Sequence, residues 1–483
     1  MSTATGGRIP VRGNFGKIWS GRADLANDSP MTAILTLAIP SMGLFVFNSL
    51  LHLVDTIFVS WLGELPMAAM SFTGPVNLCV FALLECVANG AIALMGRNMG
   101  RGDTESARHI ARSALALLYV VCLISTPLIL PSVSNVVFAT IGAEGSDELL
   151  TLCWKYNMWI PILLPFMGFT YIGNTIFRAQ GDTMTPFKAI ALANTINIAL
   201  DPLFIFVFGW GIGGAAIATW ISRIASSLYL LRRMRSSSAI VVSPFLKPWD
   251  RLTTWWRAIL WIGIPVALTS ASIALGMGSV NKILSTFGHR AVASWMLGLR
   301  VEELAFNFAN GINAALIPYI AFNYGRRDAG RMLAGFKSAV ALALVLMCTM
   351  GAVIYTWPGL FLGLFRPVPE IEQMASRAIR ASVPAYPFGI LVSLSCGFFV
   401  GTGYSIFGTM TQLMRSIVFR VSAAWLFATY VGFTYIWWFQ SFAAFCGSFV
   451  AVFLFVIVFR KIKRKLAGES ASVPATPSGM AAQ

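Results

Sequence analysis

The chain contains 483 residues, of which 57% are hydrophobic and only 11% are charged, and its mean hydropathy is +0.74. These values lie far outside the range of soluble globular proteins and indicate a polytopic membrane protein. The excess of 35 Lys and Arg over 19 Asp and Glu would suit a nucleic-acid partner, but its distribution among the loops, described below, argues against one.

Twelve segments are apolar and long enough to cross a bilayer, which takes roughly 20 residues of helix. In chain order they lie near residues 33–61, 66–96, 110–131, 150–176, 185–208, 212–232, 257–286, 291–321, 335–358, 376–400, 408–430 and 436–460. They leave almost nothing for a soluble domain. The sequence therefore predicts an all-α polytopic membrane protein with 12 transmembrane helices.

Lysine and arginine precede the first predicted span and follow the second, sixth, eighth and twelfth, whereas the intervening loops carry few. This is the positive-inside pattern, and it places both termini in the cytoplasm. The first thirty residues lack the apolar core of a cleavable signal peptide, and we expect them and the tail from Ala467 onward to be disordered flanks. We expect a multi-pass protein of the bacterial inner membrane.

The two halves of the chain repeat one another. A shift of 225 residues aligns Pro40 with Pro265, Gly63 with Gly288, Asn98 with Asn323, Gly100 with Gly325 and Asp103 with Asp328. A shift of 222 residues aligns Pro165 with Pro387 and Gly181 with Gly403. Each half contains six spans, so the two halves have the same orientation and form a duplicated bundle with a central cleft, as alternating access requires.

The repeat sets the expected domain boundaries. They are an N-terminal leader (1–30), an N-lobe (31–232), a cytoplasmic linker (233–256), a C-lobe (257–460) and a C-terminal tail (461–483). The fold class is therefore two pseudo-symmetric six-helix lobes. A duplication without transport is the structural alternative.

Four motifs in this order carry a family resemblance. They are "LAIP" followed by "VDTIFVSWLG" in the first span, "RAQGDTMTP" at 178–186, "NIALDPLFIF" at 197–206 and "GIGGAAIAT" at 211–219. With these motifs the chain, from about 31 to 460, resembles the multidrug and toxic compound extrusion family, close to its bacterial DNA-damage-inducible branch. The resemblance implies an exporter of bulky, often cationic or amphipathic compounds, driven by inward sodium ions or protons and needing no cofactor.

The resemblance also implies site residues. Asp55, Asn197, Asp201 and Thr219 match the N-lobe cation or proton site, which could hold Na⁺, and Pro40 matches the kinking proline of the first helix. Members of the vibrio type carry an aspartate in the tenth span, but here that span, "SVPAYPFGILVSLSCGFFV", has no acid. We therefore expect coupling to occur in the N-lobe.

Depth in the membrane selects the same four residues. Asp55, Asp201 and Thr219 each lie about seven or eight residues from the outer end of a span, roughly 10–12 Å deep. Asn197 precedes Asp201 by four residues and shares its helix face. Acids in the hydrocarbon generally mark ion pathways, and two at one depth repel unless a proton or cation lies between them. The structural alternative is that Asp201 only hydrogen-bonds Asn197 or Thr219.

Other polar residues inside the spans are weaker candidates: Lys282, Arg300, Glu302 and Glu303 in the C-lobe, and His52 and Glu85 in the N-lobe. The C-lobe group forms either a salt-bridge network or a contact for a cationic substrate. Glu85 has no charged partner at helical spacing, and both interpretations stay open for it. His52 precedes Asp55 by three residues and either relays protons or packs as an ordinary buried histidine.

The glycine-containing motifs are interpreted as structural. "RAQGDTMTP" predicts a turn in which Thr185 caps the helix that begins with Pro186. "GIGGAA" predicts a tight outer turn that leads into a close contact between helices. The seven cysteines form no CxxC pair and the three histidines are scattered, so neither a disulfide framework nor a zinc site is indicated.

Four functions were compared on these features. An ion-coupled exporter of drugs and toxic organic compounds is favoured, with membrane lipid around it, no nucleic-acid partner and a monomeric state. A flippase for lipid-linked saccharides would be expected to line its cavity with several arginines, and deep basic residues are few, namely Lys282, Arg300, Arg223 and Arg420. An intramembrane enzyme would need a catalytic cluster, and none is apparent. A channel does not require a duplicated lobe with one acidic pocket.

Overall fold

The computed structural model describes residues 14–126, 147–242, 252–365 and 367–471, and nearly all of them are helical. The first half of the chain contains α1 (Asn14–Ile18), α2 (Pro30–Ser60), α3 (Glu64–Gly100), α4 (Thr104–Ser125), α6 (Asp147–Asn157), α7 (Ile160–Ala179), α8 (Met184–Pro202), the π-helix η2 (Leu203–Val207) and α9 (Gly211–Ser237).

The second half is built in the same way. It contains α10 (Trp256–Ser285), α11 (His289–Gly325), α12 (Ala329–Thr356), α13 (Pro358–Leu362), the 3₁₀ turn η3 (Gly363–Phe365), α14 (Pro369–Ser382), η4 (Val383–Ala385), α15 (Tyr386–Thr402), α16 (Ser405–Leu413), the π-helix η5 (Met414–Phe419), α17 (Arg420–Leu426), the π-helix η6 (Phe427–Val431), η7 (Ile436–Trp438) and α18 (Phe439–Ala471).

Ten helical segments of the described residues are long and apolar enough to cross a membrane. The other two predicted spans are present as interrupted helices. The fourth is divided between α6 and α7, and the eleventh is divided by the π-helix η5 between α16 and α17. The all-α fold with twelve spans is thus confirmed. The end of the third predicted span and part of the predicted linker, residues 243–251, lie outside the described residues.

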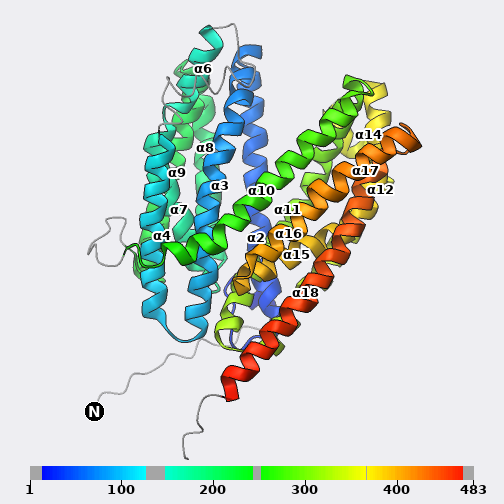
Figure 1. Ribbon diagram of the computed structural model, residues 1–483. Helices are drawn as coiled ribbons and strands as arrows, with labels where there is room; N and C mark the ends of the chain where they lie inside the picture. The colour runs from blue at the N-terminus through cyan, green and yellow to red at the C-terminus, as the bar shows by residue number, and fades with distance from the viewer. Residues whose placement is uncertain (1–13, 127–146, 243–251, 366, 472–483) are drawn as a thin grey trace, which may run out of the picture.

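The helices form two bundles, which we call the N-lobe (α2 to α9) and the C-lobe (α10 to α18). The bundles lie together at the end where α2 begins and α18 ends, and they diverge toward the opposite end (Figure 1). We call these the terminal end and the distal end. At the terminal end, Ile34 and Leu37 of α2 belong to the same apolar core as Ile312 and Leu316 of α11. The lobes therefore share buried surface at the terminal end.

Glycines allow the lobes to touch through their backbones at the terminal end. A Cβ atom at Gly100 of α3 would lie 2.0 Å from the carbonyl oxygen of Phe322, and one at Gly325 of α11 would lie 2.0 Å from that of Arg97. A shift of 225 residues exchanges the two contacts. The repeat in the sequence is therefore a pseudo-twofold axis between the lobes in space.

The repeat also appears in the helix caps. The side chain of Asp103 accepts a hydrogen bond from the backbone N–H of Ser106 at the start of α4, and Asp328 accepts one from that of Arg331 at the start of α12. Each bond satisfies one of the unpaired N–H groups of a helix N-terminus. The two aspartates aligned by the 225-residue shift thus have the same structural role.

The prediction that Thr185 caps the helix after "RAQGDTMTP" is wrong. Helix α8 begins at Met184, and the carboxylate of Asp182 accepts hydrogen bonds from the backbone N–H and the hydroxyl of Thr185, both at 2.9 Å. An aspartate is the better acceptor for free N–H groups at a helix N-terminus because its charge also favours the positive end of the helix dipole. The predicted turn is present, with Gly181 at φ +79°.

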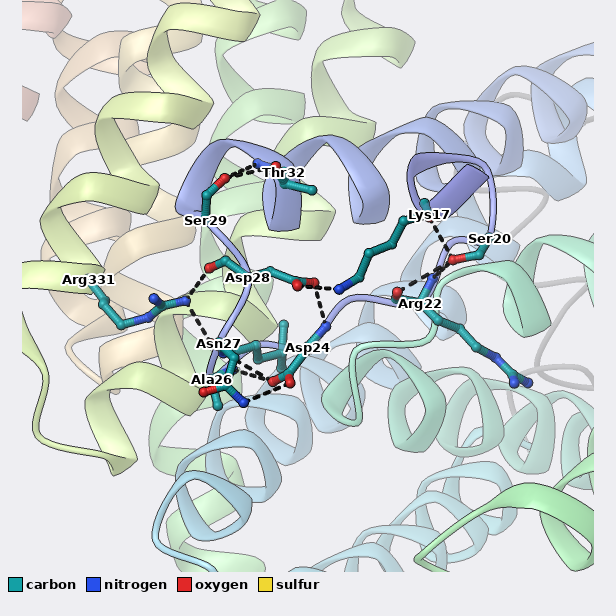
Figure 2. A network of polar contacts seen from close by, with 11 residues as sticks. Lys17, Ser20, Arg22, Asp24, Ala26, Asn27, Asp28, Ser29, Thr32 and Arg331 are labelled. Atoms are coloured by element: carbon teal, nitrogen blue, oxygen red, sulfur yellow. Dashed lines mark hydrogen bonds and ion pairs between the residues drawn. The ribbon is translucent and has the colours of Figure 1, made fainter. Parts of the chain in front are cut away.

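The expectation of a disordered leader is wrong for residues 14–29, as is that of a disordered tail for 467–471, where α18 continues. Figure 2 shows a leader held by polar contacts, among them the ion pair of Lys17 with Asp28. Arg22 pairs with Asp182 of the N-lobe at 2.9 Å. Arg331 of the C-lobe donates to the carbonyl of Asp28 at 2.6 Å. The polar residues of the leader therefore make contacts with both lobes.

Candidate functional site

Four predicted site residues meet between α2, α8 and α9 of the N-lobe. The amide Nδ2 of Asn197 donates to Oδ1 of Asp201 at 3.1 Å and to Oγ1 of Thr219 at 3.5 Å. Asn197 and Asp201 are fully buried and share one face of α8. The carboxyl group of Asp55, on α2, lies within hydrogen-bonding reach of that of Asp201. The residues that the sequence placed at one depth are therefore neighbours.

Three oxygen atoms of this cluster are buried and have no hydrogen-bond partner among the described residues. They are Oδ1 of Asp55, Oδ2 of Asp201 and Oδ1 of Asn197. A buried acceptor without a donor is unfavourable by about 1–3 kcal/mol, and by more when it is charged. The hydrogen bonds of Asn197 do join α8 to α9, as the structural alternative requires, but they leave these oxygens unsatisfied. The cluster suits a shared proton or a hard cation such as Na⁺, which binds oxygen ligands.

Two further residues belong to this cluster. Arg223, one helical turn beyond Thr219 on α9, interacts electrostatically with Asp55, and Tyr156 of α6 lies close to both carboxyl groups. The arginine could have been found from the sequence, because it follows Thr219 by four residues and therefore lies on the same face of the helix. Nothing in the sequence pointed to Tyr156, because its position depends on how α6 packs against the other helices.

His52 and Pro40 both lie on α2. The side chain of His52 is exposed, not buried as a packing histidine would be, and it interacts electrostatically with Asp55. Pro40 is buried inside the helix, where a Cβ atom at Gly21 of the leader would lie 2.8 Å from its Cγ. Its role as a hinge and the proton relay through His52 stay predictions.

The C-lobe candidates do not form one salt-bridge network. Arg300 and Glu303 form an ion pair of 3.3 Å between side chains that are more than half exposed. Lys282 is exposed on α10. Glu302 is buried instead, and its Oε1 accepts a hydrogen bond from Nε2 of Gln440 on α18 at 3.2 Å. The predicted network is therefore divided into an exposed pair and a buried carboxylate.

The partners of Glu302 were missed by the sequence analysis. Arg415 and Arg420, at the two ends of η5, are buried and interact electrostatically with Glu302. Arg420 had been noted as a deep basic residue, but Arg415 had not. In an α-helix two residues five apart would point about 140° away from each other, so their shared direction depends on the π-helix between them. The available signal was two arginines within one otherwise apolar span.

Glu85 has a charged partner on another helix. It interacts electrostatically with Arg178 of α7, whose Nη2 donates to the carbonyl oxygen of Ala314 on α11 at 2.7 Å. Spacing along one helix could not reveal this pair. Arg178 thus joins the N-lobe to the C-lobe, and both interpretations of Glu85 stay open.

Comparison with known proteins identifies the family of the chain. The family model described as MatE matches residues 40–203 and 265–426. An FAD transporter from Shewanella oneidensis is 31% identical over 356 residues, which cover 70% of this chain and 75% of that protein. A probable multidrug resistance protein NorM from Thermotoga maritima is 26% identical over 384 residues, which cover 77% of this chain and 80% of that protein.

Solved structures share the fold. The outward-facing conformation of a multidrug resistance MATE family transporter superimposes with a TM-score of 0.86 at 24% identity, over 91% of this chain and 98% of that one. A MATE structure in the bent conformation superimposes with a TM-score of 0.85 at 25% identity, over 92% of this chain and 98% of that one. The two matched segments of the family model correspond to the two lobes.

Proposed function

The chain belongs to the MatE family of transporters and is not an enzyme, and from this premise we propose that it exports organic compounds against an inward flow of protons, by alternating access. Several relatives are multidrug export proteins, including MepA from Staphylococcus aureus. We propose further that the protein acts as a monomer in the bacterial inner membrane, with its terminal end in the cytoplasm.

The observation that carries this proposal is the group of unsatisfied oxygens in the N-lobe. One carboxylate oxygen of Asp55 and one of Asp201 have no hydrogen-bond donor among the described residues, and Asn197 adds a third such oxygen. A proton shared by the two carboxyl groups removes their repulsion, whereas its loss leaves two charges in one pocket. The protonation state of the pair therefore changes the energy of the N-lobe, and transport needs such a change.

Coupling requires that the ion bind the two conformations with different affinity. A nearly complete switch takes on the order of 5.5 kcal/mol of differential binding. The lobes of the described conformation are packed together at the terminal end. The acidic pair lies nearer the distal end, because Asp55 is close to the last residue of α2, Ser60. In this proposal protons enter from the distal side. We propose that protonation of the pair from that side favours bending at Pro40 and release of the cargo.

The test is transport by purified protein in liposomes at a fixed membrane potential. A pH step alone should drive movement of a fluorescent cationic drug in the absence of sodium. Asp55→Asn and Asp201→Asn should abolish this movement, whereas Glu105→Gln, a change of the same kind at an exposed position in the first turn of α4, should not. Transport that needs sodium and ignores pH would assign the same site to Na⁺ and overturn proton coupling.

The relatives differ in their cargo. One is an FAD transporter, and others are multidrug exporters. A flippase for lipid-linked saccharides, the alternative from the sequence, has no counterpart among these relatives and is not favoured. The relatives therefore do not define the cargo of this chain.

A further inference from the structure

The C-lobe contains a cavity of about 350 Å³, within the range of small-molecule sites. Apolar residues of α10 and α11 form its wall, among them Ile273, Met277, Leu299 and Phe306. Its polar lining is Arg300, Glu302, Glu303, Gln412, Arg415, Arg420 and Gln440. Because Arg300 and Glu303 are exposed while the other polar residues are buried, the exposed pair marks the mouth and the buried residues mark the floor.

The floor of this cavity carries one more positive than negative charge. Arg415 is 8% exposed, Arg420 is 6% exposed and Glu302 is 9% exposed. The two arginines also interact with each other electrostatically. Glu302 can neutralise only one of them. A buried charge is strongly unfavourable unless it is paired and hydrogen-bonded.

The arginines also lack hydrogen-bond partners. The Nε atoms of Arg415 and Arg420 are buried with no acceptor among the described residues. Among the described residues, the Glu302 carboxylate accepts one hydrogen bond, and its donor is Gln440 and not an arginine. Two guanidinium groups with free donors, each more than nine-tenths buried, therefore line one cavity. An anion is the ligand that would satisfy both the charge and the donors.

The backbone is shaped to hold Arg415 in place. A Cβ atom at Gly447 of α18 would lie 2.9 Å from Cβ of Arg415, and one at Gly389 of α15 would lie 3.3 Å from its Nη2. The side chain thus runs between two helices that approach closely only because both positions are glycine. The π-helix η5 then brings Arg420 to the same side, and π-helical turns often occur at functional sites. The two glycines and the π-helix thus fix both arginine side chains at the cavity.

We propose that this cavity binds the anionic group, a phosphate or a carboxylate, of an amphipathic cargo. Arg415 and Arg420 donate to the anion, with Gln412 and Gln440 beside it, and the organic part of the cargo lies against the apolar wall. Arginine suits this role because its planar guanidinium can donate two parallel hydrogen bonds to such a group. The inference rests on the proposed function as an exporter, and it names the class of substrate.

The experiment compares two probes that differ only by a phosphate, riboflavin and flavin mononucleotide. Their binding to purified protein is measured in detergent by quenching of flavin fluorescence. The wild type should bind flavin mononucleotide about tenfold more tightly than riboflavin, since only the phosphate accepts charge-assisted hydrogen bonds from the two arginines. Equal affinity for the two probes would overturn the inference.

The variants locate the site. Arg415→Gln and Arg420→Gln should each weaken binding of flavin mononucleotide about tenfold and leave riboflavin unchanged, and Arg415→Lys should restore part of the loss. Arg290→Gln, at an exposed ion pair of the same lobe, is the matched control and should change neither probe. If the arginine variants weaken both probes equally, the arginines only support the fold and the inference is wrong. Unchanged riboflavin binding shows that a variant is folded.

Two further arms separate the sources of the anion and the two proposals. If phosphatidylglycerol competes with flavin mononucleotide in the wild type, the cavity takes a lipid headgroup, and if it does not, the cavity takes a soluble cargo; both results retain the anion site. If the wild type shows no preference for flavin mononucleotide over riboflavin but still exports a cationic drug in response to a pH step, only the present inference is overturned. Intact preference with no proton-driven export overturns only the proposed function.

Discussion

The two lobes share a fold and differ in the charge of their interior. The positions that correspond to Asp55 and Asp201 in the C-lobe are Val280 and Ala423, which belong to one buried apolar cluster together with Trp295. In the other direction, Arg415 corresponds to Ala193 in the N-lobe. Duplication thus supplied one scaffold twice, and the positions of Asp55, Asp201 and Arg415 are charged in one copy and apolar in the other.

This difference assigns separate tasks to the lobes. An acidic pocket can take up a proton or a cation, and a basic pocket can take up an anionic group. If both lobes carried a pair of neighbouring carboxyl groups such as Asp55 and Asp201, the coupling ion would have two competing sites. The helix caps and the contacts between the lobes remain alike in the two halves, because both halves must pack against each other in the same way. The comparison predicts asymmetric effects of interior mutations and symmetric effects at the contact between the lobes.

The largest asymmetry is expected between the acids of the two lobes. Asp55→Asn and Asp201→Asn should each abolish proton-driven export while membrane expression stays near the wild-type level, because each removes the shared ionisable pair. Glu302→Gln should keep export of a cationic drug dependent on the pH step, because its carboxylate does not belong to the ionisable pair; only the affinity for cargo should change. The measurement is drug efflux by intact cells together with quantification of the protein in membranes. A Glu302 variant as inactive as the aspartate variants would place coupling in both lobes.

The contact between the lobes should respond symmetrically. Gly100→Ala and Gly325→Ala each place a methyl group 2.0 Å from a backbone carbonyl of the other lobe, so the lobes must separate at the terminal end. We expect each change to destabilise this conformation by about 1–3 kcal/mol, as overpacking generally does. Thermal unfolding in detergent measures the effect. Gly278→Ala of α10, which has no neighbour within 4 Å, is the control and should be neutral or slightly stabilising.

Unequal losses in the two glycine variants would contradict the pseudo-twofold contact. A loss in one lobe alone would mean that only one of the two backbone contacts is formed in the dominant conformation. That outcome would leave the acidic and basic pockets in place but remove the symmetric frame that relates them.

The aligned prolines should again differ. The carbonyl of Pro265 on α10 accepts hydrogen bonds from the hydroxyls of Thr269 at 3.0 Å and of Thr409 on α16 at 2.5 Å, which fasten this point of the helix. No side-chain donor to the carbonyl of Pro40 is found among the described residues. A proline weakens a helix locally and permits bending. Pro40→Ala should therefore reduce the transport rate several-fold, and Pro265→Ala should reduce it less.

Transport rate and thermal stability should be measured on the same preparations of both proline variants. The prediction requires that Pro40→Ala change transport more than unfolding. If Pro265→Ala slows transport as much as Pro40→Ala does, bending is a property of both lobes and not of the acidic lobe alone.

The sequence predicted the frame of this molecule better than its interior. Spans, repeat and orientation of the halves follow from hydropathy and spacing, which act along one helix. The meeting of Asn197 with Asp201 was predictable for the same reason. The pairs that were missed, Glu85 with Arg178 and Glu302 with Arg415, join different helices. Whether such groups come close depends on the rotation of each helix in its bundle. For Arg415 it also depends on the π-helix η5, which could not be predicted from the sequence.

The ordered leader was missed for a related reason. Its composition is polar, which suits a disordered segment, yet its polar groups bind two lobes that the sequence does not bring together. To the N-lobe it is joined by backbone hydrogen bonds, from the N–H of Ala23 to the carbonyl of Gly181 and from that of Thr183 to Gly21. To the C-lobe it is joined by Arg331 and Asn323, which donate to leader carbonyls. The N-lobe attachment thus combines hydrogen bonds between backbone groups with the Arg22–Asp182 ion pair, whereas the C-lobe attachment uses side-chain donors alone among the described residues.

The smallest predicted effect uses this difference. Burial alone would raise the pKa of Asp24, but hydrogen bonds from the side chain of Asn27 and the N–H groups of Ala26 and Asn27 lower it below its ordinary value overall. A lowered pKa stabilises the leader turn above the ordinary value of about 3.9, and the stabilisation is lost as the pH falls through the folded value. The turn that presents the leader carbonyls to the C-lobe should therefore loosen below about pH 4.

Hydrogen exchange of single backbone amides tests this expectation at pH 6 and pH 3, after correction for the intrinsic pH dependence of exchange. The amides of Ala26 and Asn27 should lose protection at pH 3, whereas those of Ala23 and Thr183 should keep it, because their carbonyl acceptors do not titrate. Asp24→Ala should expose the first pair at both pH values, whereas Asp24→Asn, whose amide oxygen accepts hydrogen bonds without titrating, should remove the pH dependence. If all four amides lose protection together, the leader is one cooperative unit, and its attachments to the two lobes are not independent.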